Sequence, residues 1–268
     1  MMKIKNLLLV ALLVVSAKGS FAQDREWGGF LGISVYNGDL AQSPIPFRGM
    51  RPAIGGLYRY NFNTRWAIKT GLNVGYIASY DRYSGKGTAR EHRNLSFFSP
   101  LVEISVVGEL NLRKYVAGSR KYNWAPYLFG GVAGYYFNPQ TYLNGKKYAL
   151  RTMNTEQQKI DDGPYQPIGI AIPLGIGFKY SLDKKKLWNL GFEVGVRITF
   201  TDYLDDVSGD LPNNIDNNTN ITPEDRALAY RGTSKWPKKW ARGNSANNDS
   251  YAFFGVTLTK TIRKYKCF

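Results

Sequence analysis

Cysteine, histidine and long apolar runs are all scarce in this chain of 268 residues. The single cysteine is Cys267, so no disulfide can form within one chain. The single histidine is His92, which leaves catalytic chemistry with few of its usual participants. Beyond residue 22 no stretch approaches 18 consecutive apolar residues, which argues against a bundle of transmembrane helices.

The N-terminus has the features of a secretory signal peptide. Lys3 and Lys5 precede an apolar run over residues 7–15, and Ser20-Phe21-Ala22 offers a small-x-small cleavage site. The run is shorter than the roughly 20 residues that a helix needs to cross a bilayer. We therefore predict a signal peptide over residues 1–22 and a single mature domain over residues 23–268. An uncleaved anchor helix is the alternative, and the absence of a following cysteine argues against a lipoprotein.

The composition favours an exported β-protein over a nucleic-acid-binding one. Aromatic residues make up 15% of the chain, with 19 Tyr, and there are 28 Gly. The formal net charge is +16, and nucleic acid is the usual partner of such a surplus. An exported protein rarely meets nucleic acid, so we predict no such partner.

Two segments alternate between apolar and polar or small residues for longer than an ordinary strand. Residues 168–180 and 188–200 each run for 13 residues with period two. Strands of soluble proteins average about 5–6 residues, whereas a tilted strand needs about 9–11 to cross a bilayer. A soluble β-sandwich also alternates and is the alternative fold. The apolar face of the second segment is Trp188, Leu190, Phe192, Val194, Val196, Ile198 and Phe200.

The remaining strands bring the total to eight. Residues 66–76 and 98–112 repeat the alternation, and weaker strands are predicted at 26–37, 51–62, 124–137 and 250–262. An even number suits a bacterial single-chain barrel. The sequence therefore predicts an all-β fold, an eight-stranded antiparallel transmembrane β-barrel. Pro126 and Pro173 fall inside predicted strands, where we interpret them as bulges.

Connection lengths predict the orientation of this barrel. Short joints at 61–65, 114–123 and 182–187 alternate with long ones at 38–50, 78–96, 138–166 and 201–249. Short turns face the periplasm and long loops face outward in outer-membrane barrels. We therefore expect both termini in the periplasm, outer-membrane lipid around the wall, and aromatic residues at its two edges. The edge residues are Trp66, Trp188 and Tyr180 on the periplasmic side, and Tyr76 and Phe200 on the outer side.

The inward-facing charges predict a filled interior rather than a pore. Period two places three acids and three bases inside a barrel that side chains can fill. Unpaired charges in so narrow a space are costly, so we expect ion pairs. The acids are Glu103, Glu109 and Glu193, and the bases are Lys69, Lys179 and Arg197.

Enzymatic and metal-binding readings have little support, and no catalytic residue, metal or cofactor is predicted. A hydrolase would need His92 beside a serine such as Ser84 or Ser96, and nothing in the spacing brings them together. The acidic run over residues 202–206 lacks the spacing and glycine of an EF-hand. Thr222-Pro223-Glu224-Asp225 has the pattern of a helix start within the last long loop.

Three short motifs at predicted strand ends resemble a known family. They are residues 32–40 (GISVYNGDL), residues 201–209 (TDYLDDVSG), and Arg242-Gly243-Asn244-Ser245 with Asp249-Ser250-Tyr251. The set is similar to the PorG-like outer-membrane barrels of the type IX secretion system of Bacteroidetes. In a closed barrel the last strand pairs with the seventh and the first, so the motifs should lie side by side at the outward lip. The alternative explanation is that the motif residues serve only to form tight turns and to cap strand ends. The lip residues are Tyr36, Gly38, Asp39, Asp202, Tyr203, Asp205, Asp206, Arg242, Gly243 and Asp249.

The resemblance implies a non-enzymatic role. Barrels of this family tie a periplasmic ring, built from the PorK lipoprotein and PorN, to the outer membrane. The alternative is a stand-alone barrel of the OmpA or OmpW kind, acting in adhesion or small-molecule passage.

Basic residues gather at the predicted periplasmic side and form a candidate partner-binding set. Such a patch suits anionic headgroups or an acidic face of a ring protein. Cys267 lies there too, and an odd cysteine in an exported protein suggests an intermolecular disulfide. A PorK-like lipoprotein is the partner we expect, and a tolerated free thiol is the alternative. The basic residues are Arg113, Lys114, Lys184, Lys185, Lys186, Arg263, Lys264 and Lys266.

Overall fold

The computed structural model describes residues 24–41, 49–83, 89–156, 163–183, 187–209, 221–232 and 242–262. The predicted signal peptide lies outside the described residues. So do Lys184, Lys185 and Lys186, as well as the C-terminal tail with Arg263, Lys264, Lys266 and Cys267.

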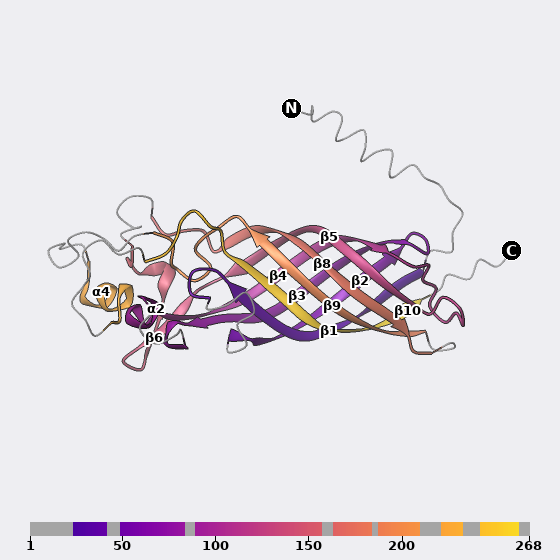
Figure 1. Cartoon of the computed structure of the whole chain (residues 1–268), viewed down its shortest axis with the longest axis horizontal. Helices are drawn as coiled ribbons and strands as arrows, with labels where there is room; N and C mark the ends of the chain where they lie inside the picture. The colour runs from indigo at the N-terminus through magenta and orange to yellow at the C-terminus, as the bar shows by residue number, and fades with distance from the viewer. Residues whose placement is uncertain are drawn as a thin grey trace, which may run out of the picture.

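Eight long antiparallel strands close into a barrel, which confirms the predicted fold (Figure 1). Neighbours in sequence pair with one another, and β1 also pairs with β10, which closes the wall. The strands cross the barrel axis obliquely, as closure requires. They are β1 (Asp24–Asn37), β2 (Arg51–Asn61), β3 (Trp66–Tyr80), β4 (Ser96–Asn111), β5 (Trp124–Phe137), β8 (Ile168–Ser181), β9 (Trp188–Thr199) and β10 (Ser250–Ile262).

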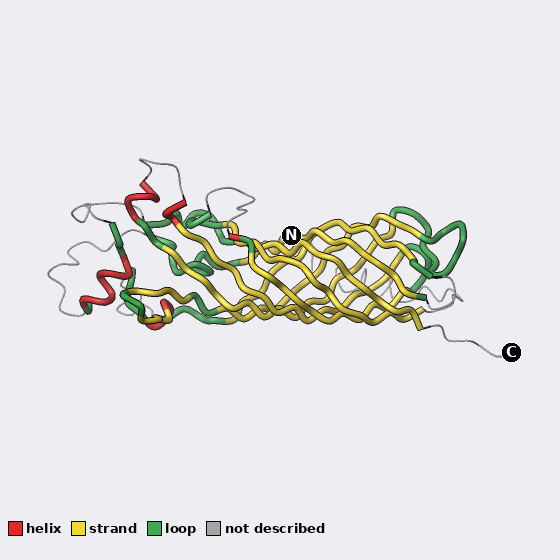
Figure 2. The backbone as a smooth tube through the Cα atoms, turned by 90° about the horizontal axis from the view of Figure 1, so that it is seen from below, coloured by secondary structure: helices red, strands yellow, loops and turns green. Residues whose placement is uncertain are grey.

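The long loops form structure of their own at one end of the barrel, which we call the loop end (Figure 2). A hairpin of β6 (Gln140–Leu143) and β7 (Lys146–Ala149) extends the wall beyond β4. Its turn is Asn144-Gly145, both with positive φ, as a two-residue hairpin turn requires. The helical pieces are η2 (Asp81–Tyr83), α2 (Ala89–Arg93), η3 (Leu150–Thr152) and α4 (Pro223–Ala229).

The helix start predicted at Thr222 is confirmed. The Thr222 hydroxyl accepts a hydrogen bond from the Asp225 backbone, and the Asp225 carboxylate accepts one from the Thr222 backbone. This reciprocal capping box satisfies two amide groups that α4 would otherwise leave unpaired.

The interpretation of Pro126 and Pro173 as bulges is wrong. Both lie in register, Pro126 opposite Phe178 and Pro173 opposite Arg197. The β5–β8 pairing omits Ile172 and Pro173 and then resumes unchanged. Proline has no amide hydrogen, so the ladder loses one bond without gaining a residue.

The outward face of the barrel is apolar, whereas its inward face has buried charged and polar side chains among aromatic and small ones, unlike the core of a soluble domain. Leu31, Ile104, Ile168 and Ile170 are each about two-thirds exposed, at 65–69%. Aromatic residues mark both edges of this apolar band, as in membrane barrels. At the short-turn end these are Trp27, Tyr58, Trp66, Trp124, Tyr180 and Trp188, and toward the loop end Tyr76, Tyr136 and Phe200. Among the described helices, none is long and apolar enough to cross a membrane.

Candidate functional site

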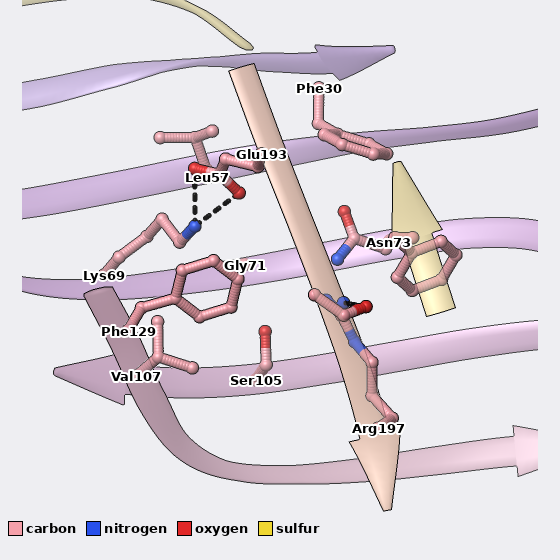
Figure 3. A pocket seen from close by; sticks show the side chains of 12 residues that line it. Phe30, Leu57, Lys69, Gly71, Asn73, Ser105, Val107, Phe129, Glu193 and Arg197 are labelled. Carbon is pink, nitrogen blue, oxygen red and sulfur yellow. Dashed lines mark hydrogen bonds and ion pairs between the residues drawn. The ribbon is translucent and has the colours of Figure 1, made fainter. Parts of the chain in front are cut away.

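A network of buried ion pairs fills the barrel toward its short-turn end. Arg59 on β2 lies 2.7 Å from Glu26 on β1 and 2.8 Å from Glu109 on β4. Lys179 on β8 lies 2.8 Å from the same Glu109 carboxylate. Lys69 on β3 lies 2.7 Å from Glu193 on β9, across the lumen (Figure 3). Arg59 and Glu26 lie on adjacent strands, whereas the other pairs join strands that are not neighbours, so the network braces the barrel from within.

A second pair lies nearer the loop end. Arg197 on β9 bonds the Glu103 carboxylate on β4 at 2.9 Å, and the Tyr251 hydroxyl donates to the same carboxylate. All six inward charges predicted from the sequence are therefore inside and paired. Sequence reasoning missed Glu26 and Arg59, although alternation in β2 puts Leu57, Arg59 and Asn61 on its buried face.

Little free space remains in the middle of the barrel. The cavity lined by Lys69, Asn73, Ser105, Glu193 and Arg197 has a volume of about 20 Å³, room for about one water molecule. Figure 3 shows these side chains pointing toward one another across it. The interior is therefore packed rather than open.

The connection between β4 and β5 closes the short-turn end. Tyr115 is 5% exposed, and its hydroxyl donates to the Asn189 side chain at 2.8 Å. The Gly118 backbone amide donates to the Ser181 hydroxyl at the end of the neighbouring strand β8. Of the two predicted basic residues described here, Arg113 stacks 4.0 Å over Trp124, while Lys114 is exposed.

At the loop end, the three lip motifs meet around one tyrosine. The Tyr36 hydroxyl, at the end of β1, lies 2.6 Å from Asp205 and 2.8 Å from Asp249. A Cβ on Gly38 would stand 1.8 Å from the Asp249 carboxylate, so only glycine fits there. The Leu204 backbone amide donates to the other oxygen of Asp249. The predicted juxtaposition at the lip is therefore present in the structure.

Asp39 of the first motif and Gly243 of the third hold the two motifs in close contact. The backbone amide of Asn244 donates to Asp39 at 2.7 Å. A Cβ on Gly243 would lie 2.4 Å from the Asp39 carboxylate, so this close approach depends on the missing side chain.

The second and third motifs contact residues that the sequence did not identify. Arg242 bonds Glu156 at 2.6 Å and lies 3.5 Å from the Asp206 carboxylate. Asp206 also accepts from the Tyr165 hydroxyl, and the Tyr165 ring stacks on Tyr203 at 4.8 Å. Glu156 and Tyr165 come from the β7–β8 connection, which contains none of the three motifs.

Arg93 on α2 joins these contacts to the rest of the loop end. Its guanidinium bonds the Asp81 carboxylate at 2.7 and 2.9 Å and the Asp39 carbonyl at 3.3 Å. Asp225 at the start of α4 accepts a bond from the Asn154 amide. The described parts of the long loops thus pack into a cap, with a core that includes Leu40, Leu204 and Leu228.

The carboxyl groups of this cap hold their protons unusually tightly. Burial, followed by neighbouring charges, raises the pKa of Asp249 to about 8 and that of Asp202 to about 7. Burial, chiefly, raises the pKa of Asp206 to about 6, and burial beside Asp249 raises that of Asp205 well above its ordinary value. The geometry around Tyr36 also indicates that one carboxyl group is protonated. One hydroxyl hydrogen cannot serve two carboxylates, so one carboxyl must carry a proton.

Among the described residues, His92 and Ser96 do not form a hydrolase site, and the acidic run does not form an EF-hand-like site. His92 is exposed on α2, while the Ser96 hydroxyl lies 3.2 Å from Arg231 and 3.4 Å from Thr141. Ser84 lies outside the described residues. The acidic run divides, with Asp205 turned to Tyr36 and Asp206 to Arg242.

Three solved structures resemble this fold at low sequence identity. The outer membrane protein OprG from Pseudomonas aeruginosa is 11% identical, with 93% of this chain and 99% of that chain covered and a TM-score of 0.40. The N-terminal β-barrel domain of OprF from the same organism is 9% identical, with 90% and 98% covered and a TM-score of 0.38. Ail, the attachment invasion locus protein of Yersinia pestis, solved with the heparin analogue sucrose octasulfate, is 6% identical, with 90% and 99% covered and a TM-score of 0.39. No curated protein sequence matches this chain.

A protein-family model covers most of the sequence. Its description is "Domain of unknown function (DUF6089)", and it matches residues 5–223. The matched region includes the barrel strands from β1 to β9 and the first two lip motifs. This chain therefore belongs to the DUF6089 family.

Proposed function

We propose that this protein is a non-enzymatic outer-membrane component of the type IX protein secretion system, which anchors a periplasmic ring of PorK-like and PorN-like proteins. The apolar outward band and its aromatic edges support a place in a membrane. The predicted signal peptide supports export, which for a bacterial barrel leads to the outer membrane. The short-turn end then faces the periplasm, with both termini on that side.

The observation that carries this proposal is that side chains close the barrel at both ends and through its middle. A channel needs a passage, whereas an anchor needs a stiff wall and exposed docking surfaces. Tyr115 blocks one end, the ion pairs around Glu109 fill the centre, and the cap around Tyr36 covers the other end. The juxtaposition of all three PorG-like motifs in that cap supports the family assignment behind the role.

The docking surface that we propose is the basic periplasmic side. Arg113 and Lys114 belong to it among the described residues, and the turn residues Lys184, Lys185 and Lys186 would extend it together with Arg263, Lys264 and Lys266. An acidic face of the ring and anionic headgroups are the partners with matching chemistry. Cys267 would add a disulfide to the PorK-like lipoprotein.

Charge reversal at this turn tests the docking role. The triple variant Lys184→Glu, Lys185→Glu, Lys186→Glu should insert normally but recover much less ring protein in a pull-down. The matched control is Lys146→Glu with Lys147→Glu, which reverses charge on the β6–β7 hairpin at the opposite end. Equal recovery of the ring with both variants would count against docking through the turn.

The disulfide has its own test. Whole cells are alkylated at lysis and run on a non-reducing gel. A band that collapses on reduction and is absent in Cys267→Ser supports the covalent link. A chain that runs only as a monomer, with its thiol free to alkylate, contradicts it.

A stand-alone barrel of the OmpA or OmpW kind is the second candidate. The cap at the loop end would suit adhesion, whereas the packed interior argues against passage of small molecules. Recovery of the protein in a large assembly favours the anchor. A monomer that conducts in planar bilayers favours the second candidate.

A further inference from the structure

Two neighbouring strands of the wall part before they reach the loop end. β8 and β9 pair from Ser181 opposite Asn189 as far as Ala171 opposite Thr199. Beyond that point, residues 168–170 pair with β5 alone. The chain after Thr199 stays with β10 instead, through a bond from the Asp249 amide to the Thr201 carbonyl at 3.0 Å. We call the resulting gap, between residues 168–170 and 200–202, the β8–β9 notch.

The notch leaves backbone groups unpaired on its β8 edge. The Pro167 carbonyl accepts from Phe137 on β5, and successive strand residues point their polar groups to opposite sides. The amide and carbonyl groups of Ile168 and Ile170 therefore face the notch. Within the described residues, no backbone hydrogen bond crosses the notch.

The side chains around the notch are apolar outside and aromatic inside. A cavity of about 200 Å³ lies there, about ten times the volume of the mid-barrel cavity. Ile168, Ile170 and Phe200 are 69%, 65% and 63% exposed on its outer side. Its inner side includes Phe137 and Tyr165, whose rings stack at 6.1 Å. The cavity could therefore receive an apolar side chain against an aromatic floor.

The unpaired backbone groups decide which kind of occupant fits. A lipid acyl chain would match the apolar lining, but it would leave amides and carbonyls unpaired in apolar surroundings, which is costly. An extended peptide matches both the lining and the backbone, because alternate residues offer bonds to an open sheet edge. We propose that the β8–β9 notch receives a short extended segment of a partner protein, which adds to the barrel wall as a strand. One apolar side chain of that segment would lie against Phe137 and Tyr165.

This site is independent of the proposed ring attachment, because it lies at the opposite end of the barrel from the basic turns. Photo-crosslinking in cells of the native host tests it on the full chain. A benzophenone amino acid at Phe200 should capture a discrete polypeptide. The control position is Leu72 on β3, which is 52% exposed and lies in complete ladders on both sides. There the same probe should give no discrete polypeptide adduct.

A pair of variants separates strand addition from simple proximity. Ile170→Pro removes an amide hydrogen that faces the notch and spares the β5 ladder, which uses residues 169 and 171. The adduct from Phe200 should fall about fivefold, the factor expected for one lost hydrogen bond. Ile170→Ala keeps that amide and should retain the adduct. Heat-dependent gel migration verifies that both variants form the barrel.

Three results would overturn the proposal. One is an adduct that contains only lipid. Another is an adduct made of two copies of this chain. The third is an equal yield of the polypeptide adduct in the Ile170→Pro variant and the unmodified chain, since that would show that the open backbone edge has no part in binding.

Discussion

Removal of the Glu109 carboxylate should destabilise the barrel more than any surface substitution. Glu109 is fully buried and lies 2.8 Å from both Arg59 and Lys179, with Lys69 at 3.7 Å. Glu109→Gln keeps the shape and deletes the charge. Lys179 then loses its one ion-pair partner among the described residues, while Arg59 retains Glu26 and Glu193. Breaking a buried pair in this way costs about 3–5 kcal/mol.

Urea unfolding in detergent micelles or lipid vesicles, followed by tryptophan fluorescence, measures that cost. The double variant Glu109→Gln, Lys179→Met should recover a large part of it, because no uncompensated ammonium remains. The matched control is Glu224→Gln on α4, an exposed carboxylate whose loss should change the stability by less than about 0.5 kcal/mol. A loss below about 1 kcal/mol for Glu109→Gln, or a double variant weaker than the single one, would refute the bracing argument.

Three further outcomes are expected. The stabilising contribution of protonated Asp249 is complete below its unfolded pKa of about 4 and is lost as the pH rises through its folded pKa of about 8. Proteolysis of the cap should therefore quicken between pH 6 and 9, roughly the range around that pKa, and Asp249→Asn should flatten the profile. Gly38→Ala should open the cap, as seen by faster hydrogen exchange there, whereas Gly56→Ala should be tolerated, since nothing lies within 4 Å of the new Cβ. His92→Ala should leave secretion and barrel assembly intact, and a secretion defect at normal protein levels would revive the hydrolase hypothesis.

Period-two alternation makes the wall and most of the lining predictable. It fixes which residues of a strand face inward, so the sequence alone places Glu103, Glu193 and Arg197 in the lumen. Arg59 follows the same rule, but it lies in a strand whose apolar residues alternate weakly, so its inward direction is hard to recognise. The β6–β7 hairpin has a local signal in Asn144-Gly145, which is hidden inside a segment interpreted as a loop.

The cap is only half predictable, because its contacts are long-range. Chain closure brings Tyr36, Asp205 and Asp249 together, and closure follows from the strand count. Glu156, Tyr165 and Arg93 reach the same place from connections without regular periodicity, and no local pattern announces partners that lie so far away in the sequence. The prolines cause the opposite kind of error, because they suggest an irregularity that the structure lacks. A missing donor suggests a bulge at Pro173, but one absent bond in a long ladder leaves the register intact.

The arrangement of the interior pairs bears on how force would travel through this barrel. Lys69 on β3 reaches Glu193 on β9, on the opposite side of the wall, so this pair spans the lumen. Lys179 on β8 reaches Glu109 on β4 past the intervening strand β5. Such ion pairs resist flattening of the barrel wall. Any change in the cross-section of the barrel would separate buried charges, which costs free energy. A load applied at the short turns would then pass to the whole wall. That is the mechanical property which the proposed anchor needs, and it is the reason why loss of Glu109 should weaken the proposed ring attachment under load even in barrels that still insert.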